Sequence, residues 1–186
     1  MKIRIQLIMF AMAIFPVLFF SSCSKLKELT VIDVSYKIPQ QSFTFTPSTF
    51  KSGEQLLYSG SINANLDSIL NAYGLSSGVV GNTEFSQCTL TIVQPDTLTF
   101  GWLQSARGEI SQTSDFNPFQ EVGTVIVPVP AAKTVTLTMN NTNIRPYLGS
   151  TAFYFRIYGT LNGPVPVDWI QMYLNGTLQM HLEPLN

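Results

Sequence analysis

The chain has 186 residues, of which 45% are hydrophobic and only 11% are charged, and its formal net charge is −1. A chain of this length can bury one sizeable core, which favours a single domain. The balanced charge, with no Lys/Arg cluster after Lys27, excludes the electrostatic footprint of a nucleic-acid-binding protein, so no nucleic-acid partner is expected.

The N-terminal segment has the three parts of an export signal. Lys2 and Arg4 form a short positive region, residues 5–20 are apolar with one exception, and two small serines precede Cys23. The apolar run is shorter than the roughly 20 residues that a membrane-spanning helix needs. An export signal is therefore favoured over a retained membrane anchor.

Two serines followed by cysteine resemble the lipobox of bacterial lipoproteins, although Phe20 stands where that family usually has an aliphatic residue. The resemblance implies removal of residues 1–22 and acylation of Cys23, which would anchor the protein in a membrane. A lipidated tether at 23–29 and one domain at 30–186 would follow. The alternative is an ordinary secretory peptide with an incidental cysteine.

The residues after Cys23 bear on localisation. Ser24 takes the place of the Asp that is associated with inner-membrane retention in such lipoproteins, so the resemblance implies the outer membrane. Lys25 and Lys27 with a single acid, Glu28, depart from the acidic run that sends some related lipoproteins to the cell surface. The periplasmic face of the outer membrane is therefore favoured over the cell surface.

Period-2 alternation of apolar and polar residues runs through most of the remaining chain, and this pattern predicts half-buried strands. Turn-forming Gly, Pro, Asn and Asp residues separate the alternating segments. These segments lie at 31–38, 42–46, 56–62, 85–93, 103–110, 122–129, 135–139 and 152–158.

One segment has helical spacing instead. Residues 66–73 carry apolar side chains at i, i+3, i+4 and i+7, with Asn65 as a possible N-cap and Gly74 as a left-handed stop. A short helix is predicted there. The sequence NTNIRPYLG is expected to form a further helical turn, which Pro146 keeps short.

The segment 168–183 contains Asn175-Gly176, a strong signal for a two-residue hairpin. All its Ile, Leu and Met residues from Ile170 to Leu182 nevertheless have even numbers. A two-residue turn would place Leu174 opposite Thr177 and mix the two faces. One long strand bent at Gly176 is favoured, since it keeps the apolar side chains on one side.

Eight or nine strands with one short helix and no βαβ repeat predict an all-β fold, an antiparallel sandwich of the immunoglobulin-like or jelly-roll type. An up-and-down barrel is the alternative. Cys88 alternates in phase with Leu90 and Ile92, so it is expected to be a small buried hydrophobic residue and not a reactive thiol.

The residues offer little support for catalysis. His181 is the only histidine, so neither a nucleophile–histidine pair nor a His/Cys metal site is supported, and no cofactor is expected. The spacing of the carboxylates selects no pair, and an envelope hydrolase is kept only as a less favoured alternative. The candidate carboxylates are Asp33, Glu54, Asp96, Glu109, Asp115 and Asp168.

Aromatic residues on otherwise polar strand faces suggest binding instead. Trp169 and Tyr173 fall on the same face of the last predicted strand. Tyr154 and Tyr158 fall together on one face of their strand, and Phe153 and its in-phase neighbours fall on the other. Such side chains can stack on sugars or anchor a protein partner. The alternative is that both faces of these strands are covered.

A second candidate is the loop SDFNPFQ, where Phe116 and Phe119 would either contact a partner or fold back onto the core. Two Asp-Ser/Thr-aliphatic segments, at Thr97 and Ser68, resemble the O-glycosylation sites of exported Bacteroidetes-type proteins.

The lipobox, the sandwich pattern and segments such as NLDSILNAYGLS, CTLTIVQPDTLTF and NTNIRPYLG resemble uncharacterised Bacteroidetes-type envelope lipoproteins, a resemblance that implies no assigned activity. The expected function is a lipid-anchored, non-catalytic binding or assembly module with an envelope protein as partner. A surface carbohydrate-binding lipoprotein is the alternative.

Overall fold

The computed structural model describes residues 32–47, 53–64, 66–72, 74–75, 79–128, 130–149 and 151–183. The export signal, Cys23, the tether and Asn65 lie outside these residues. The described strands are antiparallel and form two sheets. The predicted all-β sandwich is therefore confirmed, and the strands do not close into the single barrel that was the alternative.

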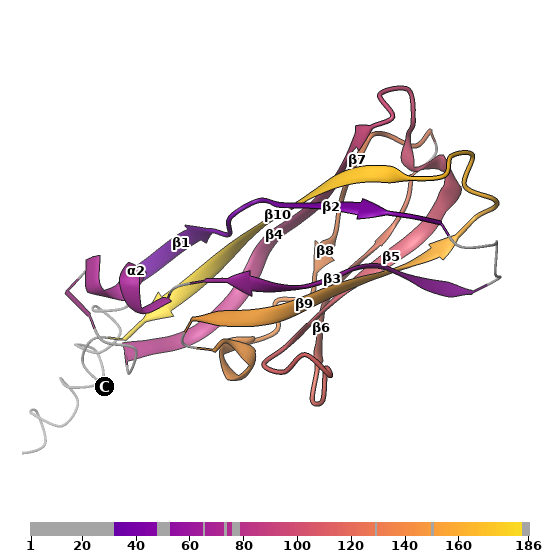
Figure 1. Cartoon of the computed structure of the whole chain (residues 1–186). Helices are drawn as coiled ribbons and strands as arrows, with labels where there is room; N and C mark the ends of the chain where they lie inside the picture. The colour runs from indigo at the N-terminus through magenta and orange to yellow at the C-terminus, as the bar shows by residue number, and fades with distance from the viewer. Residues whose placement is uncertain are drawn as a thin grey trace, which may run out of the picture.

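The sheets are named A and B, and both are antiparallel throughout. Sheet A has the order β1-β10-β4-β7, with β2 paired to β10 beside β1, and sheet B has the order β3-β9-β5-β6-β8 (Figure 1). The strands of sheet A are β1 (Ile32–Lys37), β2 (Gln41–Phe45), β4 (Val80–Gln94), β7 (Thr134–Thr136) and β10 (Ile170–Leu182). The strands of sheet B are β3 (Glu54–Asn63), β5 (Leu103–Ser111), β6 (Gln120–Ile126), β8 (Thr138–Met139) and β9 (Ala152–Leu161).

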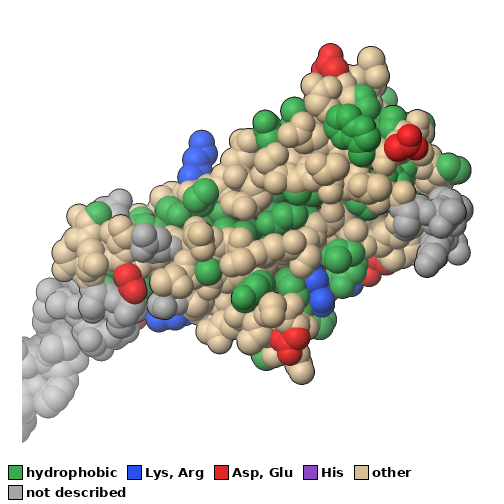
Figure 2. Space-filling view, in the orientation of Figure 1, with side chains coloured by type: hydrophobic (Ala, Val, Ile, Leu, Met, Phe, Trp, Pro, Cys, Tyr) green, Lys and Arg blue, Asp and Glu red, His purple; other side chains and the backbone are tan. Residues whose placement is uncertain are grey.

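One side of the sandwich is formed by the edge strands β2 and β3, which belong to different sheets. Phe43 and Tyr58 join them across this side, with ring centroids 4.8 Å apart. Figure 2 shows hydrophobic side chains gathered between these strands and only scattered charges on this face. An aromatic contact, and not a hydrogen-bonded ladder, therefore closes this side of the core.

On the opposite side of the sandwich, the structure differs from one predicted strand. Residues 135–139 are not one strand but two, because β7 pairs with β4 in sheet A while β8 pairs with β6 in sheet B. Leu137 lies between them, buried, and its amide donates to the carbonyl of Cys88 at 2.9 Å. The chain thus passes from one sheet to the other at Leu137.

β10 is a single continuous strand, so the prediction of one long strand in place of a hairpin is confirmed. Every even-numbered residue from Ile170 to Leu182 is buried. A hairpin turn of type I′ needs positive φ at both central residues, and neither Asn175 nor Gly176 has it. Gly176 is needed for space: an added Cβ would lie 3.0 Å from Ile38 Cδ1 and 3.4 Å from Phe85 Cε1.

The helical predictions are confirmed. Helix α2 spans Leu66–Ala72 and Gly74 follows with φ of +70°, the left-handed conformation in which glycine commonly ends a helix. The 3₁₀ turn η3 spans Arg145–Tyr147, and another, η2, spans Phe100–Trp102. Among the described residues, no helix is both long and apolar enough to cross a membrane.

The core lies between the sheets and is rich in aromatic residues. Phe85 of sheet A packs against Phe155 of sheet B, with ring centroids 5.5 Å apart. Cys88 is buried as predicted, and desolvation raises the pKa of its thiol to about 12. It therefore behaves as a small hydrophobic side chain and not as a nucleophile.

Candidate functional site

The outer face of sheet B carries most of the polar chemistry of this domain. Alternation on β5 and β9 points their other residues into the core, and the register places Arg107 opposite Tyr158, Glu109 opposite Arg156, and Ser111 opposite Tyr154. These side chains therefore form cross-strand rows on one surface.

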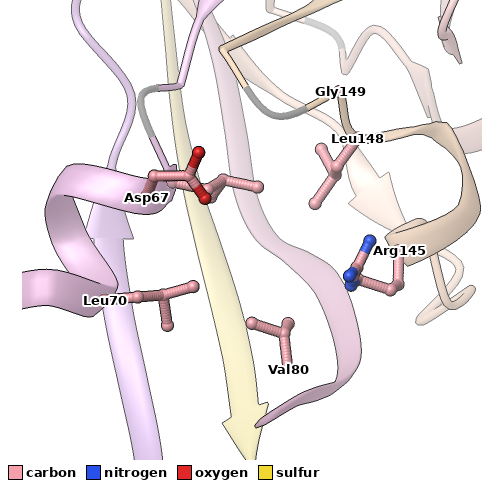
Figure 3. A pocket seen from close by; sticks show the side chains of 7 residues that line it. Asp67, Leu70, Val80, Arg145, Leu148 and Gly149 are labelled. Carbon is pink, nitrogen blue, oxygen red and sulfur yellow. The ribbon is translucent and has the colours of Figure 1, made fainter. Parts of the chain in front are cut away.

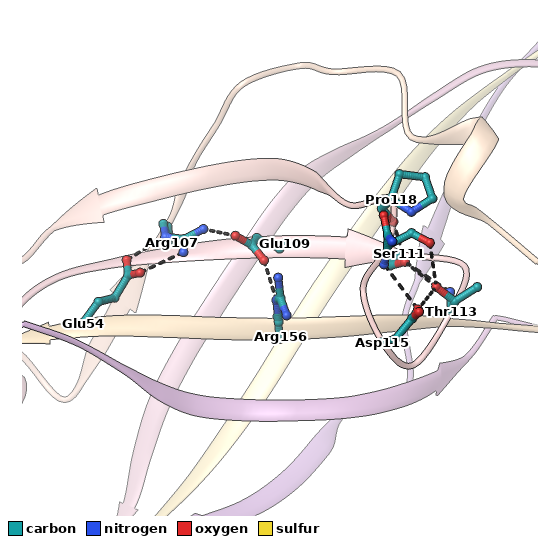
Figure 4. Close-up of polar contacts among 9 residues, drawn as sticks. Glu54, Arg107, Glu109, Ser111, Thr113, Asp115, Pro118 and Arg156 are labelled. Atoms are coloured by element: carbon teal, nitrogen blue, oxygen red, sulfur yellow. Dashed lines mark hydrogen bonds and ion pairs between the residues drawn. The ribbon is translucent and has the colours of Figure 1, made fainter.

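Four charged side chains on this face form one chain of ion pairs (Figure 4). Arg107 donates from Nε and Nη2 to Glu54 at 2.6 and 2.8 Å. Glu109 accepts from Arg107 Nη1 through one oxygen and from Arg156 Nε through the other. The Glu109 side chain is only 1% exposed, and a carboxylate so buried is tolerated because each oxygen has a cationic donor.

The pKa values of Glu54 and Arg107 shift in directions that are consistent with each other. The hydrogen bond from Arg107 lowers the pKa of Glu54, and the same bond raises the pKa of Arg107. Both shifts keep the pair ionised. The pair is partly exposed, so its contribution to stability is small.

Aromatic rings surround the two arginines. Tyr158 lies between them, with its ring centroid 4.7 Å from Arg107 Cζ and 5.1 Å from Arg156 Cζ. Arg156 Cζ also lies 4.1 Å from the ring centroid of Phe116 and 5.3 Å from that of Phe119. These distances are those of cation–π contacts, so the face is a compact block of arginine, glutamate and aromatic side chains.

The loop 112–119 supplies two of these rings. The Ser111 hydroxyl donates to the carbonyl of Pro118 at 2.7 Å, and the Thr113 hydroxyl donates to Asp115 at 2.5 Å. The bond from Thr113 lowers the pKa of Asp115. This polar frame (Figure 4) holds Phe116 at φ of 54°, a conformation that side-chain-bearing residues rarely adopt.

The two phenylalanines of this loop take different positions. Phe116 folds back and is buried, whereas Phe119 is 49% exposed. Phe116 is buried against Arg156 and is not part of the core cluster between the sheets, and contact of the loop with a partner stays a prediction. Only Phe119 is available for contact with another molecule.

Two further apolar side chains are exposed on the same face. Leu56, opposite Tyr158 on β3, is 48% exposed, and Ile126, opposite Ser105 on β6, is 82% exposed. With Phe119 they add exposed apolar surface to the face that carries the arginine–glutamate block. We refer to Leu56, Arg107, Phe119, Ile126, Arg156 and Tyr158 as the sheet B patch.

The four aromatic residues that the sequence singled out do not lie on one surface. Tyr154 and Tyr158 are half-buried on the outer side of β9 in sheet B. Tyr173 is half-buried on the outer side of β10 in sheet A, and Trp169, just before β10, is 49% exposed. Only Tyr158 of the four belongs to the sheet B patch.

The remaining sequence candidates are scattered. Ser68 on α2 and Thr97 in the turn after β4 are both exposed. His181 Nδ1 lies 2.5 Å from Asp33 on β1. Within the described part of the chain, no three His, Cys, Asp or Glu side chains are grouped to hold a metal ion.

A pocket of about 170 Å³ lies at the α2 end of the sandwich. Leu70, Val80 and Leu148 give it an apolar lining, and Asp67 and Arg145 lie on opposite sides of it (Figure 3). A space of this size holds a small group, about as large as benzene. It is smaller than the usual ligand site, so the sheet B patch is the stronger candidate.

No protein-family model and no curated protein matches this chain. Solved structures with some likeness are Desmodium yellow mottle tymovirus (12% identity, 84% of this chain and 90% of that one, TM-score 0.27) and the VP2 subviral particle of infectious bursal disease virus (12% identity, 84% and 34%, TM-score 0.34). At such low identity and TM-score, these likenesses carry no argument about this chain.

Proposed function

We propose that this chain is a lipid-anchored, non-catalytic module of the bacterial outer membrane that binds a protein partner through the sheet B patch. The proposal that the chain binds a protein partner rests on the composition of the patch. Exposed Leu56, Phe119 and Ile126 lie on the same sheet face as arginines that are already packed against aromatic rings.

This composition is that of a protein–protein interface. Arg, Tyr and Phe are enriched in interface cores, and Arg and Tyr are among the residues that contribute most to binding. The patch is also pre-organised, because the ion pairs to Glu109 already hold Arg107 and Arg156 in place. Little side-chain entropy would therefore be lost on binding.

The anchoring half rests on the lipobox resemblance at Cys23. Several acyl chains on one residue give stable membrane attachment, whereas one chain gives only marginal binding. The residues after Cys23 favour the periplasmic face of the outer membrane. The carbohydrate-binding alternative has less support, because Tyr154 and Tyr158 lie on sheet B while Tyr173 lies on sheet A.

Photo-cross-linking in cells tests the binding half. A benzophenone amino acid at Phe119 is expected to form an adduct with an envelope protein, because this side chain lies in the sheet B patch. The matched control is the same substitution at Trp169, an aromatic residue of equal 49% exposure near sheet A, which is expected to give little adduct.

An adduct from Trp169 but not from Phe119 would move the interface to the other sheet. A lack of protein adducts from both positions would overturn the proposal of a protein partner. Glycan arrays would then test the carbohydrate alternative.

A further inference from the structure

Arg156 is held in place by groups that use only part of its hydrogen-bonding capacity. Its Nε donates to the buried carboxylate of Glu109. Phe116, Phe119 and Tyr158 place their rings around its guanidinium. The position of the side chain is therefore fixed before any partner arrives.

The terminal amino groups of Arg156 have no acceptor among the described residues. An arginine has five N–H donors, and the hydrogen bond that Arg156 makes here is from Nε. Arg107 on the same face differs, because its Nε, Nη1 and Nη2 all donate to Glu54 or Glu109. The Arg156 side chain is 19% exposed, so a partner can reach it.

We infer that the terminal amino groups of Arg156 bind a carboxylate of the protein partner, an Asp or Glu side chain flanked by apolar residues. A planar carboxylate matches the two amino groups of an arginine in a bidentate pair. The exposed Phe119 and Leu56 would receive the flanking apolar side chains. This inference rests on the proposed function, since it names the chemistry recognised at the same patch.

The surrounding charges favour a singly charged carboxylate over a phosphate. Glu54 and Glu109 lie in the same ion-pair chain, and Glu121 lies opposite Glu109 in the register of β5 and β6. These acids would repel a doubly charged group more strongly than a single carboxylate. The aromatic rings around Arg156 limit its hydration, which strengthens a contact with an anion.

The test uses two blocked tripeptides, Leu-Glu-Leu and Leu-Gln-Leu, which differ only in the carboxylate. Each is titrated into the full chain in detergent micelles, and the NMR signals of the Arg156 Nε–H and the Phe119 amide are followed. The glutamate peptide is expected to bind about tenfold more tightly, the ratio typical of one charge-assisted contact.

The decisive variant is Arg156→Lys. Its single ammonium can still pair with Glu109 but offers no planar pair of amino groups, so the preference for the glutamate peptide should disappear. Arg145→Lys, at η3, should keep the preference, and unchanged core signals would show that both variants fold.

Equal binding of the two peptides, binding of neither, or a preference that survives in Arg156→Lys would overturn the inference. None of these results would remove a cross-link formed from Phe119 in cells. A wrong carboxylate assignment is therefore distinguishable from a wrong interface.

Discussion

Glu109 is almost fully buried on a sheet face that would otherwise be solvated, and Arg107 and Arg156 neutralise it from two sides. Each arginine is also in contact with the ring of Tyr158. Loss of the central carboxylate would leave two guanidinium groups close together without their shared partner. The stability of this face is therefore expected to depend more on Glu109 than on any exposed charge.

We expect Glu109→Gln to destabilise the fold by about 3 kcal/mol, because it breaks a buried ion pair on one side only. Glu54→Gln is the matched control, since it removes another carboxylate that pairs with Arg107 but is partly exposed. Its expected cost is less than about 1 kcal/mol. Urea unfolding of the two variants measures the difference, and equal losses would contradict the role given to Glu109.

For single residues, the sequence predicts which side chains are buried better than it predicts which side chains pair with one another. Alternation with Leu90 and Ile92 was enough to place Cys88 in the core, where it lies. Alternation also puts Arg107 and Glu109 on the same strand face, but no local pattern pairs Glu109 with Arg156, which is 47 residues away. Such a contact depends on the register between β5 and β9.

Among the elements, β10 shows how tertiary packing overrides a local turn motif. Its Asn175-Gly176 pair lies inside a continuous strand that is paired to β4 on one side and to β1 and β2 on the other. The buried even-numbered side chains fix this register, since a hairpin would expose half of them.

This arrangement predicts different effects for substitutions at two neighbouring positions. Gly176→Val should destabilise by about 1–3 kcal/mol through overpacking against Ile38 and Phe85. Asn175→Thr should change stability by less than about 0.5 kcal/mol, since the residue is half-buried in a strand that needs no turn. Thermal unfolding of both variants is the measurement, and severe loss from Asn175→Thr would indicate that a turn is required.

The elements themselves were largely predictable, with informative exceptions. The helix, the 3₁₀ turn at η3 and the long last strand follow from periodicity and stop signals. The division of 135–139 into β7 and β8 does not, because alternation through Leu137 is the same whether the chain stays in one sheet or crosses to the other. β4 also begins at Val80, before the predicted start at residue 85.

For the whole molecule, the position of the N-terminal strand relates the fold to the membrane. β1 begins at Ile32, at the α2 end of the sandwich (Figure 1). Nine positions separate Ile32 from Cys23, so an extended tether would span at most about 30 Å. A lipid on Cys23 would thus keep the α2 end close to the bilayer.

The whole-molecule arrangement of surface aromatics was the part that the sequence could not supply. Tyr154 and Tyr173 both alternate with buried apolar neighbours, yet they lie in strands of different sheets. Strand order, set by long-range pairing, decides which polar faces become one surface. The sheet B patch was therefore visible only in part, through Phe119 and Tyr158.

The most direct test of lipid anchoring is the intact mass of the chain purified from the membrane fraction. We expect a mature protein that has lost residues 1–22 and begins at Cys23 with the added mass of its acyl chains. A chain that keeps Met1, begins at another residue, or carries a free thiol at Cys23 would contradict it.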